Sequence, residues 1–151
     1  MCGLLLMPSF SHAAGAIKIT DTTAFFAIDF KFSEAPFDQE VPIAAQHGIT
    51  YQDRVDTLGY TLESDNPEAP KATNVNAIVL SKSPVDGVRY DIPEGSEGVF
   101  TLVILATFAE PIVSDLRAYI TKLPYFIDGR RTTVHQNQLD ALSVPVLDIE
   151  D

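Results

Sequence analysis

The chain contains 151 residues, and its 21 Asp and Glu residues against 10 Lys and Arg residues give a formal net charge of −11. A chain of this length corresponds to one domain, and a hydrophobic content of 46% is enough to build a core, which excludes a disordered protein. The single cysteine excludes an intramolecular disulfide, and the acidic balance excludes both a general nucleic-acid binder and adsorption to anionic lipid.

The first 13 residues resemble the second half of a secretory signal peptide. A short apolar run, Leu4–Met7, precedes Ser11-His12-Ala13, which has the small-x-small pattern of a cleavage site. The run is far shorter than the roughly 20 apolar residues that span a bilayer, so we predict no membrane insertion. We expect cleavage after Ala13, a single mature domain over 14–151, and an exported protein that is extracellular or at the cell surface. The alternative is a disordered or weakly docked N-terminus.

Apolar and polar residues alternate with a period of two along much of the chain, which is typical of half-buried β-strands. Ala24–Phe32 places Phe26, Ile28, Phe30 and Phe32 on one face, so this face is predicted to be buried. Val99–Phe108 is apolar on both faces, which predicts a central strand.

Prolines and strand-forming residues indicate the remaining strands and their positions in the sheets. Pro42 and Pro145 predict edge positions for the strands Val41–Ala44 and Leu142–Ile149. Asp115–Leu123 also fits a helical stripe, but its β-branched and aromatic residues favour a strand. The other predicted strands are Ala16–Thr20, Ile49–Gln52, Thr57–Leu62, Val75–Ser81 and Val88–Ile92.

Polar segments rich in proline, glycine and acidic residues separate these strands. The sequence therefore predicts about eight to ten short strands with turns every 8–12 residues or so, which is the pattern of an all-β sandwich. The predicted loops and turns are Ser33–Gln39, His47-Gly48, Glu63–Thr73, Pro93–Gly98 and Asp128–Asp140.

The segment Tyr90–Thr101, YDIPEGSEGVFT, resembles a turn and its flanking strands in bacterial immunoglobulin-like or fibronectin-like domains. Together with FFAIDFKF, GITYQ and VPVLDIE, it is similar to the small exported sandwich domains of bacterial surface proteins, over about Ala16 to Glu150. The resemblance implies an immunoglobulin-like β-sandwich in an adhesive or wall-binding setting, and it implies no catalytic or ligand-binding residue. The antibody-type Cys–Trp–Cys framework is absent, because the chain has no Trp and only Cys2.

No motif with established chemistry is present, so we expect no enzyme activity, no metal site and no cofactor. The histidines His12, His47 and His135 have no metal-ligand spacing, and neither a nucleophile elbow nor a phosphate-binding glycine loop occurs. The acidic residues between Asp53 and Glu68 leave loop calcium as an unsupported alternative to a solvated acidic face.

The candidate binding residues follow the predicted strand Asp115–Leu123. Tyr125 and Phe126 are the aromatic residues most expected to be exposed, and Arg130 and Arg131 form the one adjacent basic pair, which could pair with an acidic loop. We predict an exported structural or adhesion-type interaction domain that binds a cell-surface protein or a glycan through loops or a sheet edge. The alternatives are a carbohydrate-binding module, marked by coplanar exposed aromatic rings, and a small accessory or hydrolase domain, marked by a pocket that holds His47 or His135 against a carboxylate.

Overall fold

The computed structural model describes residues 14–32, 37–50, 52–127, 130–133 and 146–147. These residues form thirteen strands and no helix, which confirms the predicted all-β fold class. The strands are β1 (Ala14–Thr20), β2 (Thr23–Phe32), β3 (Gln39–Pro42), β4 (Ala45–His47), β5 (Leu58–Ser64), β6 (Ala72–Ser81), β7 (Val85–Asp86), β8 (Arg89–Ile92), β9 (Gly98–Phe108), β10 (Leu116–Lys122), β11 (Pro124–Ile127), β12 (Arg130–Thr133) and β13 (Val146–Leu147).

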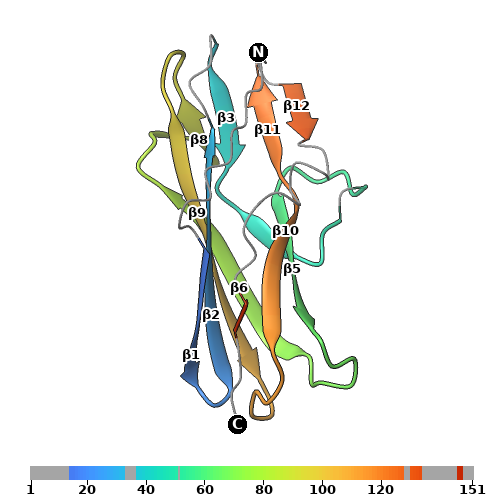
Figure 1. Cartoon of the computed structure of the whole chain (residues 1–151). Coiled ribbons are helices and arrows are strands. Elements are labelled where there is room, and N and C mark those ends of the chain that lie inside the picture. Colours follow the sequence, from blue (N-terminus) through green and yellow to red (C-terminus); the bar gives the residue numbers. More distant parts are fainter. Residues whose placement is uncertain (1–13, 33–36, 51, 128–129, 134–145, 148–151) are drawn as a thin grey trace.

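The strands form three sheets arranged as a two-layer β-sandwich. Sheet A has the order β1-β2-β9-β6, sheet B the order β12-β11-β3-β8-β7, and sheet C the order β13-β10-β5-β4. Sheets B and C lie end to end in one layer, because β10 leads into β11 after Leu123, and sheet A forms the other layer (Figure 1). All strand pairs are antiparallel except β4 with β5.

The core lies between the layers and is rich in phenylalanine. Every second side chain of β2 is buried, so the predicted alternation of Ala24–Phe32 is confirmed. Phe30 stacks on Phe100 of β9 at 5.4 Å between ring centroids, and Phe32 meets the same ring edge-on at 5.8 Å. Tyr125 of sheet B contacts Phe32 at 5.5 Å, which ties the two layers together at this end.

Two further predictions on strands are confirmed. β9 lies between β2 and β6, so it is a central strand of sheet A. β10 replaces the helical alternative for Asp115–Leu123, and its side chains alternate between buried and half-buried positions.

The predicted edge position of Val41–Ala44 is wrong. β3 lies in the middle of sheet B, between β11 and β8. Pro42 is tolerated there because it is the last residue of β3, where it pairs with Arg89 of β8, whereas β11 pairs with β3 at Glu40. The chain then leaves sheet B and enters sheet C as β4.

The predicted strand Ile49–Gln52 is also wrong for the described residues Ile49, Thr50 and Gln52, which form a loop. The Asp53 carboxylate accepts hydrogen bonds from the Thr50 N–H at 2.8 Å and from its hydroxyl at 3.1 Å. This local bonding competes with strand pairing. Gly48 supplies the turn that was expected after His47, with a φ of +85°.

The strand number exceeds the eight to ten expected, because the chain changes sheet after β3 and because short pairings form at β7 and β12. Arg130–Thr133, expected in a polar loop, is β12 and pairs with β11. Val146–Leu147 forms β13 at the edge of sheet C, as predicted for the last strand. The rest of the predicted strand Leu142–Ile149 and the predicted signal peptide 1–13 lie outside the described residues.

Candidate interaction surface

The outer face of sheet A is apolar and uncovered in the described chain. Alternation places one set of side chains in the core and the other set on this face, which no other sheet covers. Its exposed members include Ile17 at 57%, Ile78 at 45% and Leu105 at 41% of their maximal accessible area.

Two adjacent rows of this face cross the sheet without a charged side chain. Leu105 pairs with Phe25 on one side and Asn76 on the other, and Val103 pairs with Ala27 and Ile78. The rows surround a shallow hollow of about 270 Å³. We call the five large apolar residues of these rows the sheet A patch, which consists of Ile17, Phe25, Ile78, Val103 and Leu105.

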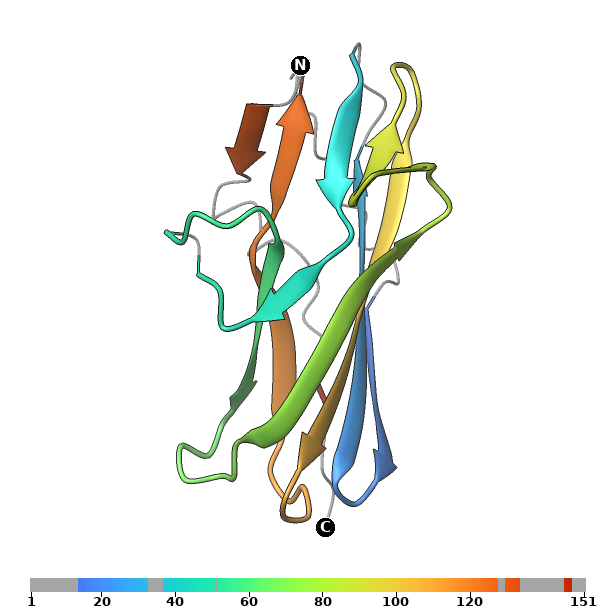
Figure 2. The same cartoon turned by 180° about the vertical axis from the view of Figure 1, so that it is seen from behind.

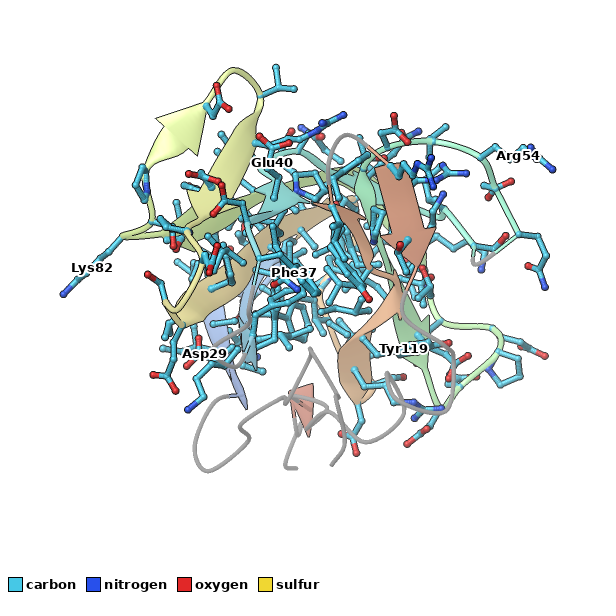
Figure 3. The ribbon with its side chains drawn as sticks, turned by 90° about the horizontal axis from the view of Figure 1, so that it is seen from above. Asp29, Phe37, Glu40, Arg54, Lys82 and Tyr119 are labelled. Carbon is cyan, nitrogen blue, oxygen red and sulfur yellow. The ribbon has the colours of Figure 1, made fainter. Side chains whose placement is uncertain are left out.

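Charged groups begin one row further along the same face. Asp29 accepts a hydrogen bond from the Thr101 hydroxyl at 2.5 Å, and Lys31 lies 3.5 Å from the Glu97 carboxylate. Asp29 points away from the core in Figure 3. The sheet therefore has an uncharged half and a half with paired charges.

A groove opens between the two layers beside β6. It has a volume of about 580 Å³, and its walls come from the loop between β5 and β6, from β5, from the starts of β6 and β10, and from the end of β9. Leu62, Phe108 and Leu116 give it an apolar floor, and His47, Glu63 and Lys71 stand among its polar lining residues. β4 lies beside β6 across this opening (Figure 2).

His47 and Glu63 share this groove, but their environments differ. The Glu63 carboxylate accepts hydrogen bonds from the Arg117 guanidinium at 2.5 Å and from the Tyr119 hydroxyl at 3.4 Å. His47 lies 5.5 Å from the Tyr60 ring, and partial burial lowers the pKa of its imidazole. Since Glu63 is engaged by Arg117, the groove does not present the histidine–carboxylate pair that would mark a hydrolase. His135 lies outside the described residues.

A larger and more open hollow of about 760 Å³ lies near the loop after β6 and the turn before β9. Serines, prolines and aliphatic residues make up most of its wall. Its ionisable residues are Lys82 and Glu97, and Glu97 already pairs with Lys31. This combination offers neither a nucleophile with an adjacent base nor an aromatic ring for a sugar.

The aromatic candidates Tyr125 and Phe126 do not form an exposed platform. Phe126 is 2% exposed, and the Arg89 guanidinium lies over its ring at 3.6 Å, so its expected exposure is wrong. Tyr125 is half-buried against Phe32, and burial raises the pKa of its phenol. Adjacent residues of a strand point to opposite faces, so the two rings cannot be coplanar neighbours.

The basic candidates Arg130 and Arg131 are the first two residues of β12. Arg130 is exposed. Arg131 donates hydrogen bonds to the Asp56 carboxylate at 3.1 Å and to the Val55 carbonyl at 3.2 Å, so it meets the acidic loop as expected. Whether either arginine contacts a partner stays a prediction.

Lys122 is buried, which the sequence pattern did not predict. Its ammonium donates to the backbone carbonyls of Asp53 and Val55, the latter at 2.8 Å, and so anchors the 49–57 loop. Burial lowers the pKa of Lys122. Arg54 in this loop points away from the body of the domain (Figure 3). A lysine in an alternating strand is normally placed on the solvent face, which is why sequence reasoning missed it.

The acidic residues between Asp53 and Glu68 do not converge on one point. Asp56 pairs with Arg131, whereas Glu63 and Asp65 both bind Arg117. Hydrogen bonds from Thr50 lower the pKa of Asp53. Within the described ranges, no group of three or more potential metal ligands occurs.

Comparisons with known proteins assign no family to the chain. No protein-family model matches it, and no curated protein matches it. Among solved structures, the chain is similar to the GAE domain of yeast GGA1, with 11% sequence identity and a TM-score of 0.37. That alignment covers 95% of this chain and 98% of the yeast chain. None of the described residues forms a helix long and apolar enough to cross a membrane.

Proposed function

We propose that this chain is a non-catalytic interaction domain that binds a partner protein through the sheet A patch. The observation that carries the proposal is the pair of uncharged cross-strand rows on an uncovered face. Contiguous apolar patches on an otherwise polar surface are characteristic of interaction sites.

The energetics favour covering this face. Full burial of one large aliphatic side chain is worth about 1.5–3 kcal/mol. The side chains of Ile17, Ile78 and Leu105 are roughly half exposed, so burying the exposed part of each would contribute about half of that free energy. Ile17, Ile78 and Leu105 together therefore offer several kcal/mol to a partner with a complementary apolar surface. Hydrogen bonds to β2 and β6 already satisfy the backbone of β9, the central strand of this face, so binding on the face need not disturb the fold.

The partner should carry a positive charge around its apolar centre. A net charge of −11 attracts basic surfaces at long range and repels acidic ones, including a second copy of this chain. Such attraction raises the association rate and weakens as salt is added.

A protein partner fits the site better than a glycan does. Sugar binding commonly uses exposed aromatic faces, whereas the most exposed large hydrophobic residues of the described chain are all aliphatic. Aliphatic side chains on a sheet face complement apolar protein surfaces instead.

We further propose that the domain acts outside the cell, at a cell surface. The support is the apolar run Leu4–Met7 followed by Ser11-His12-Ala13. The mass of the protein purified from its native host should correspond to a chain that begins at Ala14. A cytoplasmic protein that retains Met1 would contradict export.

A selection of peptides tests the binding proposal. Peptides of about ten random residues, the length of a long strand, are displayed on phage and panned against the full chain. We expect enriched peptides with apolar residues and flanking Lys or Arg, and we expect Leu105→Lys to abolish their binding. Val88→Lys is the matched control, because Val88 is an aliphatic residue that is 74% exposed and lies outside the patch. Peptides that bind Leu105→Lys as tightly as the unsubstituted chain would contradict this site.

A further inference from the structure

We infer that the partner binds as an extended segment that adds to the free edge of β6 and so lengthens sheet A. This inference rests on the proposed function, because it specifies the form in which a partner reaches the sheet A patch. The relevant part of the edge is Ala72–Ala77, which we call the open half of β6. The other half is covered, because Ala44 bridges Ile78 and the Val79 N–H donates to the Ile43 carbonyl at 3.0 Å. β4 follows Ala44 and lies beside β6 without pairing with it, so an added strand would enter the gap between these two strands.

The backbone of the open half presents hydrogen-bonding groups to an incoming strand. The Val79 N–H points away from β9, since it reaches Ile43. In an antiparallel pair, successive residues direct their backbone groups to alternate sides, so Val75 also points its N–H and C=O away from β9. Val75 pairs with Ala106 on the β9 side, and no described strand pairs with it on the other.

The sequence of β6 lacks the features that normally protect an edge strand. Its ten residues, ATNVNAIVLS, include no proline and no charged side chain. Natural edges are typically short, charged or interrupted by proline, which prevents pairing with other chains. The other edges of the described sheets follow this rule. β1 contains Lys18, β12 contains Arg130 and Arg131, β4 has three residues, and β7 and β13 have two residues each.

The surroundings of the open half suit alternate side chains of an added strand. Residues opposite Val75 would point inward, toward the groove of about 580 Å³ with its floor of Leu62, Phe108 and Leu116. Residues opposite Asn76 would point outward and extend the sheet A patch. An extended segment with an apolar residue at every second position therefore fits both sides, which is a known mode of peptide recognition.

A segment of a basic partner fits better than a second copy of this chain. Two copies would each bring a net charge of −11, and Ile43 and Ala44 leave each copy with only half of β6 to share. A basic segment meets no repulsion from β6 itself and is attracted by the chain as a whole.

The test uses Val75→Pro in the full chain, with the most enriched phage peptide as the probe. Proline removes the N–H that faces the open side and leaves the β9 ladder intact, so the fold should survive. Val75→Ala is the control, because it loses the same side-chain contacts but keeps the N–H. We expect Val75→Pro to weaken peptide binding at least about tenfold, and Val75→Ala to weaken it by less than about threefold. Hydrogen exchange of the Val75 amide should slow when the peptide binds the unsubstituted chain.

The outcomes separate this inference from the proposed function. If Val75→Pro and Val75→Ala bind the peptide equally well and Leu105→Lys does not bind it, strand addition is overturned. The sheet A patch then remains the binding site. Loss in Val75→Pro together with slowed exchange at Val75 supports strand addition. Far-UV circular dichroism and the unfolding midpoint establish that Val75→Pro is folded, and if it is not, N-methylation of alternate peptide amides tests the same bonds from the peptide side. Concentration-dependent dimers that Val75→Pro abolishes would identify a second copy as the occupant and overturn the inference.

Discussion

The two faces of sheet A are built from the same strands and similar residues, yet within the described part of the chain one is covered and the other is not. On the inner face, Phe30 and Leu102 are at most 1% exposed, whereas Leu105 of the same β9 strand is 41% exposed. An apolar face without a covering layer is unusual in an antiparallel sheet, where the outer face is normally polar. This difference is the basis for the proposal that the outer face contacts a partner.

The covered and uncovered faces should respond very differently to substitution. Phe30→Ala removes a buried ring that stacks on Phe100 at 5.4 Å, so we expect the free energy of unfolding to fall by about 3–5 kcal/mol. Leu105→Ala should lower it by less than about 1 kcal/mol, because the side chain is already partly solvated. Urea unfolding measures both values. Similar losses at the two positions would show that the outer face is covered in solution.

Alkaline pH perturbs the covered region through Tyr60. Burial raises the pKa of Tyr60 to about 12, against 10.0 for an exposed tyrosine. The stabilisation is fully present below pH 10, because both states are then protonated, and it is lost between about pH 10 and 12, where the unfolded state alone ionises. The loss amounts to about 2–3 kcal/mol. Tyr60→Phe should flatten this part of the pH profile of unfolding, and an unchanged profile would contradict the buried environment.

Two glycines compare a covered position with an uncovered one at the level of a single methyl group. At Gly59 in β5, an added Cβ would lie 2.6 Å from the Ile49 carbonyl oxygen, so we expect Gly59→Ala to cost about 1–3 kcal/mol. Gly15 in β1 has nothing within 4 Å of such a Cβ, and Gly15→Ala should change stability by less than about 1 kcal/mol. Thermal unfolding of the two variants checks this, and equal midpoints would contradict the packing around Gly59.

Lys122 stabilises the loop that covers part of sheet C. Lys122→Met keeps the length of the side chain but removes its hydrogen bonds to Asp53 and Val55, so we expect a loss of about 1–2 kcal/mol. Trypsin should then cleave faster after Arg54, which is exposed in the 49–57 loop. The rate of that cleavage, followed by mass spectrometry, is the measurement. Unchanged cleavage would show that Lys122 does not hold the loop.

Local pattern predicted most of the fold. The alternation of Phe26, Ile28, Phe30 and Phe32 indicated the buried face of β2, and the apolar β9 indicated a central strand, because burial on a sheet depends on a period of two. The position of Pro42 could not be predicted in this way. Its strand lies inside sheet B, and strand order depends on contacts between residues that are distant in the chain.

The candidate site was less predictable. Sequence reasoning chose Tyr125 and Phe126 because aromatic residues often anchor interfaces, but Phe126 lies beneath Arg89, a contact that only the folded chain creates. One part of the sheet A patch can be detected in the sequence, because the residues on both faces of β9 are apolar. Apolar residues on both faces predict a central strand, and sequence does not distinguish a face covered by the same chain from one that is left exposed.

The most direct test of the interaction surface is the chemical shift of its methyl groups when the selected peptide is added. Methyl spectra of the full chain should show shifts at Ile78, Val103 and Leu105, which form neighbouring positions on the outer face of sheet A. The methyls of Leu58 and Ile92, which are buried in the other layer, should stay in place. Shifts confined to the 49–57 loop or to β11 and β12, with none on the sheet A patch, would contradict the account.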